Sequence, residues 1–174
     1  MTKSLPLRLR DIFFPIVCVK AQPPNAEGKV ADHYDDDDIV VTFAFELSSD
    51  KKGAHAVLKL ETKITAEAAA PLPYELEMQV VAGFDVVLPE HEDEKALWFR
   101  KNAAAAALIG AAREQVAMTT ARGPWGTAFM PMISIHGLIG AFPKGEAIAA
   151  PQIKVAAKPE TKPAAKPKRI TAPR

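Results

Sequence analysis

The sequence has a single cysteine, Cys18, and only four histidines among its 174 residues. One cysteine cannot form a disulfide bond within the chain, and so few scattered histidines give none of the ligand spacings of a structural zinc site. Such a composition fits a reducing compartment. We therefore expect a cytoplasmic protein that binds no metal and needs no cofactor.

Long apolar runs are also missing. No segment approaches the roughly 20 uncharged apolar residues that cross a bilayer, and the chain does not start with a basic stretch followed by an apolar one. We expect no membrane insertion.

The motifs of common enzymes are absent as well. The sequence contains no Gly-x-Ser-x-Gly elbow, no glycine-rich phosphate loop and no pair of histidines at ligand spacing. His136 could act as a base, but a lone histidine near an apolar run is more often structural. The acidic run 32–38 lacks the central glycine and closing glutamate of a calcium loop, which favours a solvated turn. We expect that the protein is not an enzyme.

Charge is unevenly distributed along the chain. Residues 1–151 contain 15 basic and 20 acidic side chains, whereas residues 152–174 contain 7 basic and 1 acidic. The last segment repeats Lys-Pro with alanines between and has no aromatic residue, a composition typical of disorder. We expect one domain over residues 1–150 and a disordered, basic Lys/Pro/Ala-rich tail over residues 151–174. Such a tail can keep an apolar particle in solution, act as a spacer, or bind nucleic acid.

The first half of the domain has the period of β-strands. Residues 11–22 are rich in β-branched and aromatic side chains, and Pro15 among them indicates an edge strand or a bulge. Apolar and polar residues then alternate after Val40, resume after a turn at residues 48–53, and alternate again from Tyr74 to a bend at Gly83. We expect a four-stranded antiparallel meander with one apolar and one polar face.

The second half changes to a helical pattern. Residues 94–121 include five consecutive alanines and an apolar stripe that contains Ala105, Leu108, Ala112 and Val116. Small side chains let a neighbouring helix or backbone approach closely, and we expect this stripe to form an oligomer interface. The fold class is therefore α+β, a four-stranded antiparallel sheet with one long helix and a short second helix or loop on one face.

The helix should end at a glycine. We expect Gly123 to supply the positive φ that commonly ends helices, and Pro124 to prevent the helix from resuming. The segment after it is apolar, rich in methionine and interrupted by Pro131. Its apolar side chains must be covered, either by the domain's own sheet or by another chain.

Two stretches of the sequence resemble the SecB family of preprotein-export chaperones. The first is AREQVAMTTARGPWGTAFMPMISIHGL at residues 112–138, which is similar to the family's helix end and Arg-Gly-aromatic junction. The second is VVTFAFELSSDKKGAHAVLKLETKITAE followed by YELEMQVVAGFDV, which is similar to the family's paired long strands. The resemblance covers about residues 12–140.

This resemblance implies a SecB-like sheet with helices on one face, assembled as a homotetramer that is a dimer of dimers. It implies an ATP-independent holdase that binds unfolded preproteins in long apolar grooves and delivers them to the SecA motor for export, without nucleotide or metal of its own. Methionine and phenylalanine suit such a surface, because they adapt to many partners.

The candidate site residues follow from the pattern and the resemblance. The client-binding candidates are Phe13, Phe14, Phe43, Phe45 and Phe84 from the strands, and Trp125, Phe129 and Met130 from the segment after the helix. Each could equally be an ordinary core residue. Glu75 and Glu77, on the polar face of the sheet, match the family's motor-docking surface, and could also be a solvated face.

Three hypotheses on function follow. The first is a general holdase for protein export. The second is a SecB-like chaperone dedicated to one client, such as an antitoxin. The third is a small nucleic-acid-associated protein that acts through its basic tail, for which the sequence offers the least support.

Overall fold

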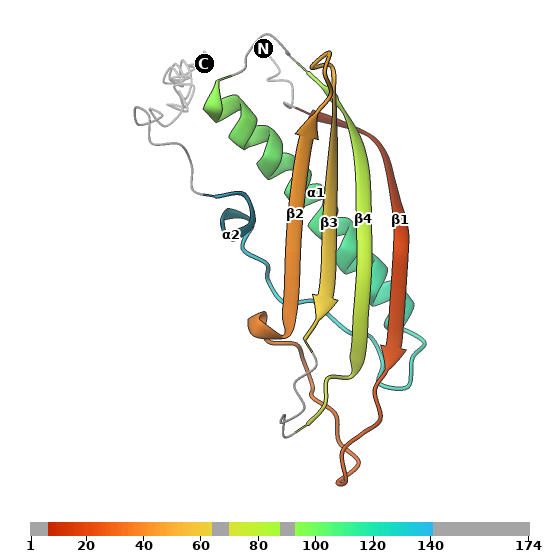
Figure 1. The fold of residues 1–174 in the computed structure, drawn as a ribbon. Helices are drawn as coiled ribbons and strands as arrows, with labels where there is room; N and C mark the ends of the chain where they lie inside the picture. Colours follow the sequence, from red (N-terminus) through yellow and green to blue (C-terminus); the bar gives the residue numbers. More distant parts are fainter. Residues whose placement is uncertain (1–6, 64–69, 88–92, 141–174) are drawn as a thin grey trace, which may run out of the picture. The chain divides into compact units, whose positions relative to one another are not determined.

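The structure is a computed structural model that describes residues 7–63, 70–87 and 93–140 (Figure 1). Four strands come first: β1 (Leu7–Ala21), β2 (Ile39–Leu47), β3 (Gly53–Thr62) and β4 (Tyr74–Val86), with a 3-10 turn, η1 (Asp36–Asp38), just before β2. A long helix, α1 (Glu94–Thr120), and a short one, α2 (Ile135–Ile139), follow. The predicted α+β class and the four-stranded antiparallel sheet with one long and one short helix are confirmed.

The order of the strands in the sheet differs from a meander. Strands β2, β3 and β4 are joined as successive antiparallel neighbours, but the sheet order is β1-β4-β3-β2 (Figure 1). The prediction of a simple meander was wrong for β1, which pairs with β4 rather than with β2. A meander needs a short turn after its first strand, and here a long connection between Ala21 and Ile39 lets β1 reach the far side of β4.

Strand β1 is an edge strand with irregular pairing, as Pro15 predicted. Its register with β4 shifts between Leu9 and Asp11 and again between Phe13 and Ile16, and the second shift contains the proline. At the first shift, the carboxylate Oδ1 of Asp11 accepts a hydrogen bond of 2.8 Å from the backbone N–H of Gly83. The side chain thus replaces a backbone acceptor that the irregularity displaces.

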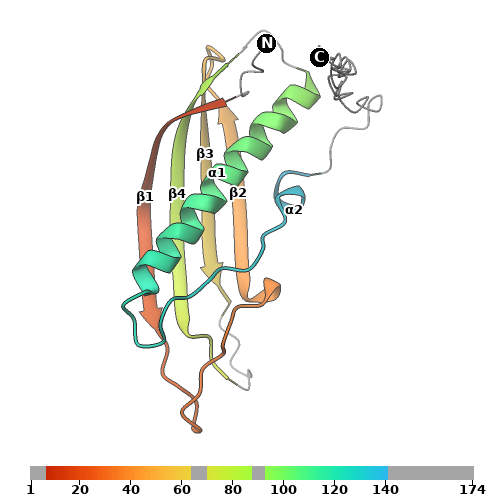
Figure 2. The ribbon, with the colours of Figure 1, turned by 180° about the vertical axis from the view of Figure 1, so that it is seen from behind.

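The alternation in β2, β3 and β4 sorts their side chains as predicted. In β4, Tyr74, Leu76 and Met78 are buried, while Glu77 between them is exposed. Figure 2 shows α1 running diagonally across one face of the sheet, so this helix covers the apolar side chains. We call the helix-covered side the inner face and the opposite side the outer face.

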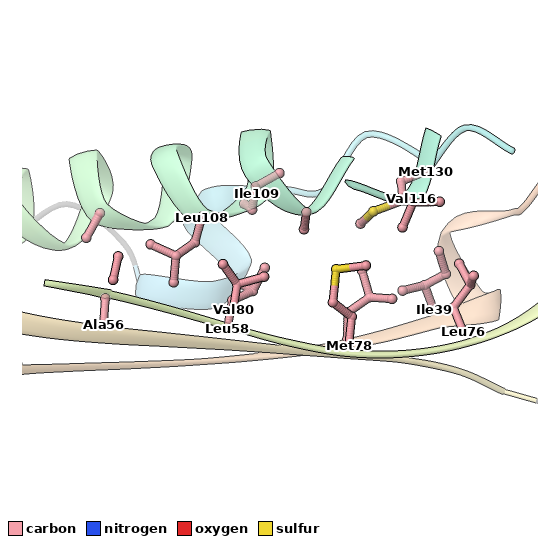
Figure 3. Close-up of a cluster of buried hydrophobic side chains, with 14 of the residues drawn as sticks. Ile39, Ala56, Leu58, Leu76, Met78, Val80, Leu108, Ile109, Val116 and Met130 are labelled. Atoms are coloured by element: carbon pink, nitrogen blue, oxygen red, sulfur yellow. The ribbon is translucent and has the colours of Figure 1, made fainter. Parts of the chain in front are cut away.

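The core lies between α1 and the inner face (Figure 3). Leu108 of the helix points toward Leu58 and Val80 of the sheet, whereas Val116 lies further along the helix, on the side of Met78 and Ile39. The side chains of Leu58, Val80, Leu108 and Val116 are each fully buried. Burial of one such side chain contributes about 1.5–3 kcal/mol, so this layer makes a large contribution to the stability of the domain.

The helix stripe that was predicted to join subunits therefore has another role. Ala105, Leu108, Ala112 and Val116 are all buried at 0% exposure within this single chain. The prediction of an oligomer interface at these four residues was wrong, because their small and apolar side chains pack on the chain's own sheet. Periodicity identified the buried face of the helix but not the partner that buries it.

The helix begins after a capping side chain. Asp93 is the N-cap, and its side chain accepts a hydrogen bond of 2.6 Å from the backbone N–H of Ala96. The short helix α2 is capped in the same way by Ser134. The basic tail predicted at residues 151–174 lies outside the described residues.

Candidate functional site

The chain between the two helices crosses the inner face of the sheet. From the C-terminal end of α1, beside β1, it returns across the sheet to α2 (Figure 2). We call residues 121–134 the crossing segment. It contains Trp125, Phe129 and Met130, three of the predicted client-binding residues.

The bend that starts the crossing segment uses its two glycines differently from the prediction. Gly126 has a positive φ of 76°, whereas Gly123 does not. The expectation of a positive φ at Gly123 was therefore wrong. A side chain at Gly123 is excluded for another reason: its Cβ would overlap the hydroxyl group of Tyr74. The bend needs glycine at position 123 for close approach and at position 126 for backbone conformation.

Tyr74 fixes the bend in place. Its Oη accepts a hydrogen bond of 3.1 Å from the backbone N–H of Trp125 and donates one of 2.9 Å to the backbone carbonyl of Gly126. The indole Nε1–H of Trp125 donates in turn to the backbone carbonyl of Gln22, at 3.0 Å. The crossing segment is thus tied to the start of β4 and to the residue after β1.

A second anchor lies at the end of α1. The buried hydroxyl of Thr120 donates to the carbonyl of Val116 at 2.8 Å and accepts from the backbone N–H of Ala128, also at 2.8 Å. The N–H of Ala128 belongs to irregular backbone and would be costly to bury without a partner. Thr120 therefore holds the segment next to the helix that it has just left.

Beyond these anchors, the crossing segment has both buried and exposed apolar side chains. Ala128 and Met130 are buried, the latter at 3% exposure, whereas Phe129 is 71% and Met132 78% exposed. Residues 128–130 alternate as an extended chain does, but Met132 breaks the alternation, because it is exposed although it is an even number of residues from Ala128 and Met130. The segment therefore exposes two large apolar side chains, three residues apart, on a backbone held by hydrogen bonds.

Two hollows flank the crossing segment. One, of about 200 Å³, is lined by Tyr34, Tyr74, Trp125 and Phe129 among others. The other, of about 280 Å³, lies beside β2 and is lined by Ile39, Val41, Met132, Ile133 and Leu138 among others. Both are smaller than the roughly 300–1,000 Å³ of typical small-molecule sites. Their size suits single side chains of a polypeptide.

Tyr34 supports the wall of the first hollow. Its hydroxyl is buried and donates a hydrogen bond of 2.9 Å to the backbone carbonyl of Tyr74. Burial raises the pKa of Tyr34 well above its usual value, so the hydroxyl keeps its proton and remains a donor.

The structure separates the predicted client-binding residues into groups. Trp125 is half-buried and Phe129 exposed at the first hollow, while Phe43 and Phe45 are half-buried on the inner side of β2. Phe13 is 52% exposed, but it pairs with Val81 and so lies on the outer face. One continuous site cannot contain both Phe13 and Phe129.

Three further candidates pack inside the domain. Phe84 and Met130, at 2% and 3% exposure, belong to the core, and Phe14 is partly buried against it. Phe84 and Met130 therefore lack the free surface that client binding requires. Both side chains face the chain's own core, the alternative that the pattern left open.

The predicted docking residues are on the outer face. Glu75 and Glu77 alternate with buried residues of β4, as the pattern indicated. Glu75 accepts a hydrogen bond of 3.0 Å from the side chain of Gln22 and lies 3.5 Å from the Nζ of Lys20. The negative charge of Glu75 is thus partly compensated, and a docking role for these two residues stays a prediction.

Sequence reasoning missed the residues that hold and complete the site. Tyr74 and Thr120 were not singled out, and neither was the exposed Met132. A signal existed for Tyr74, since a tyrosine on the buried face of a strand needs a hydrogen-bond partner for its hydroxyl. The partner itself is 51 residues further along the chain and could not be identified from spacing.

Two further properties concern membranes and metals. Within the described ranges, neither helix combines the length and the apolar character that a membrane-spanning helix requires. The same residues contain no cluster of three or more His, Cys, Asp or Glu side chains placed to hold a metal ion.

Comparison with known proteins gives structural likenesses only. No family model matches the sequence, and no curated protein matches it either. Among solved structures, the fold matches a SecB-like chaperone of Mycobacterium tuberculosis in complex with a peptide from an antitoxin. The two chains are 15% identical, the TM-score is 0.48, and the match covers 74% of this chain and 91% of the other.

A second match is a protein of unknown function from Streptococcus agalactiae. Here the identity is 11% and the TM-score 0.43, and the match covers 75% of this chain and all of the other.

Proposed function

We propose that this protein is a holding chaperone that binds unfolded polypeptides without chemistry of its own. The observation that carries the proposal is the crossing segment, whose backbone is fixed by Tyr74 and Thr120 while Phe129 and Met132 point outward. Large exposed apolar side chains on a held backbone are costly for a protein without a partner for them, and they mark interaction sites.

The two hollows suit the same role. Each can take one apolar side chain of a client, and each burial contributes about 1.5–3 kcal/mol. Several such contacts retain a long unfolded chain with little dependence on its sequence. A folded protein has already buried these side chains and does not compete.

The finer parts of the proposal rest on the resemblance in sequence to the SecB family. They are a homotetramer built as a dimer of dimers, a cytoplasmic location, unfolded preproteins as clients, and delivery to the SecA motor. The outward face of α1, which includes Ala106, Gly110 and Met118, is exposed and remains available for subunit contacts.

Aggregation assays with several unrelated unfolded proteins test the proposal. We expect the wild-type protein to suppress their light scattering, and Phe129→Ser to weaken this suppression. Phe13→Ser is a matched control, because it removes an exposed phenylalanine from the opposite face of the sheet. If both variants hold clients as well as the wild type does, the crossing segment is not the site.

The same assay separates the alternative functions. Suppression for a single partner only would favour a chaperone dedicated to one client, such as an antitoxin. Binding to nucleic acid that disappears when residues 152–174 are deleted would favour the third hypothesis, action through the basic tail. A protein that protects no client at all would overturn the proposal.

A further inference from the structure

Met132 combines an exposed position with a contact to a cation. It is 78% exposed in the crossing segment, and its Sδ lies 3.3 Å from Nη1 of Arg113 on α1. A thioether sulfur is a weak acceptor, so this contact contributes little by itself. It does place the guanidinium group of Arg113 where it would bind an oxygen atom attached to the same sulfur.

The other methionines of the described residues lack this combination. Met78 and Met130 are buried in the core, at 2% and 3% exposure, and are shielded from reagents in solution. Met118 is 65% exposed, but it lies on the outward side of α1 rather than at either hollow. Met132 alone among these four is both accessible and part of the candidate site.

Peroxides oxidise an exposed thioether to a sulfoxide. The sulfur attacks one oxygen of hydrogen peroxide, an S–O bond forms and the O–O bond breaks. The proton of the transferred oxygen passes to the departing hydroxide, which leaves as water. Sulfur loses two electrons and the peroxide gains them, so no further reactant is needed. The product is polar, and methionine sulfoxide reductases convert it back.

At Met132 the new oxygen would meet Arg113. A sulfoxide oxygen is a good acceptor, and a hydrogen bond from a charged guanidinium is stronger than one between neutral groups. The polar group would stand at the rim of the hollow that Ile39 and Val41 help to line. An apolar client side chain entering this hollow would then have to displace a bound polar group.

We propose that Met132 is a site of reversible oxidation by peroxide, and that Arg113 holds the sulfoxide and so closes the hollow beside β2 to clients. This inference rests on the proposed holding function. It adds a modification that lowers client affinity under oxidising conditions and that reduction reverses.

The test uses the full-length protein, hydrogen peroxide and a client shown to be held before oxidation. Mass spectrometry of peptides should find oxygen added at Met132 and Met118, with Met78 and Met130 spared. Oxidation should weaken client binding roughly tenfold, the effect of losing one buried apolar side chain. Methionine sulfoxide reductases for both epimers, supplied with a dithiol that provides the two electrons, should restore it.

Two leucine variants decide which methionine matters. Each variant is compared with its own untreated sample. Met132→Leu should keep after peroxide whatever client binding it has before it, whereas Met118→Leu should lose client binding on oxidation as the wild type does. Equal loss in both variants, or no loss in the wild type, would overturn the inference while leaving the holding function intact. Failure of the untreated wild type to hold any client would instead overturn the proposed function.

The part played by Arg113 has its own control. In oxidised Arg113→Gln, the sulfoxide is no longer held, and the reductases should repair it faster than in the wild type. Arg122→Gln, which changes an exposed arginine elsewhere on the bend, should leave the repair rate unchanged. Equal repair rates in all three proteins would show that Arg113 does not hold the sulfoxide.

Discussion

Helix α1 and the crossing segment are consecutive apolar stretches that differ in where their apolar side chains point. The helix directs its stripe at the chain's own sheet and leaves nothing of it outside, as Leu108 and Val116 illustrate (Figure 3). The crossing segment buries Ala128 and Met130 but exposes Phe129 and Met132. Burial of apolar side chains holds α1 on the sheet, whereas a few hydrogen bonds hold the crossing segment. A segment held by hydrogen bonds can leave apolar side chains exposed for a partner.

The largest effect should come from the helix. Leu108→Ala removes a fully buried side chain from the layer between α1 and the sheet and leaves a cavity, which should lower the free energy of unfolding by about 2–5 kcal/mol. Denaturation with urea measures this loss. Client binding per folded molecule should stay unchanged, and a small loss of stability would mean that the core is less tightly packed than described.

An intermediate effect should come from the anchor. Tyr74→Phe leaves the N–H of Trp125 and the carbonyl of Gly126 without their partner, which should cost about 1–3 kcal/mol. Hydrogen exchange at the amide of Trp125 should accelerate, and client binding should weaken.

Tyr34→Phe is the control for this change. It also removes one buried hydroxyl, but the hydrogen bond that it loses goes to the carbonyl of Tyr74 rather than to the crossing segment. If the amide hydrogen of Trp125 exchanges equally fast in both variants, the hydroxyl of Tyr74 is not the anchor.

The smallest effect on stability should come from the outward side of α1. Ala106→Glu changes an exposed residue and should alter the free energy of unfolding by no more than about 0.5 kcal/mol. If this side joins subunits, the variant should nevertheless elute as a smaller species on a sizing column. Ala105→Glu, one position away but buried, should unfold the domain instead.

The sequence predicted those features that depend on local period. The buried residues of β4, the length of α1 and the edge position of β1 all follow from alternation, helical spacing and Pro15. Each of these is decided by residues that are close together in the chain.

Features decided by distant contacts could not be predicted. The pairing of β1 with β4, the burial of Ala105 by the chain's own sheet and the close approach of Gly123 to Tyr74 all join residues far apart in sequence. For the candidate site, composition indicated the apolar segment around Trp125 and Phe129. It could not tell that Phe84 is enclosed and that Phe13 faces the other way.

The anchoring hydroxyl has a consequence for synthesis on the ribosome. Tyr74 emerges well before Trp125, because 51 residues separate them, and the strands to which Tyr74 belongs are complete in sequence before the bend leaves the exit tunnel. The segment with the outward-pointing Phe129 is therefore made after the four strands and α1. The nascent chain thus contains Tyr74, which holds the bend, before it contains the exposed apolar side chains.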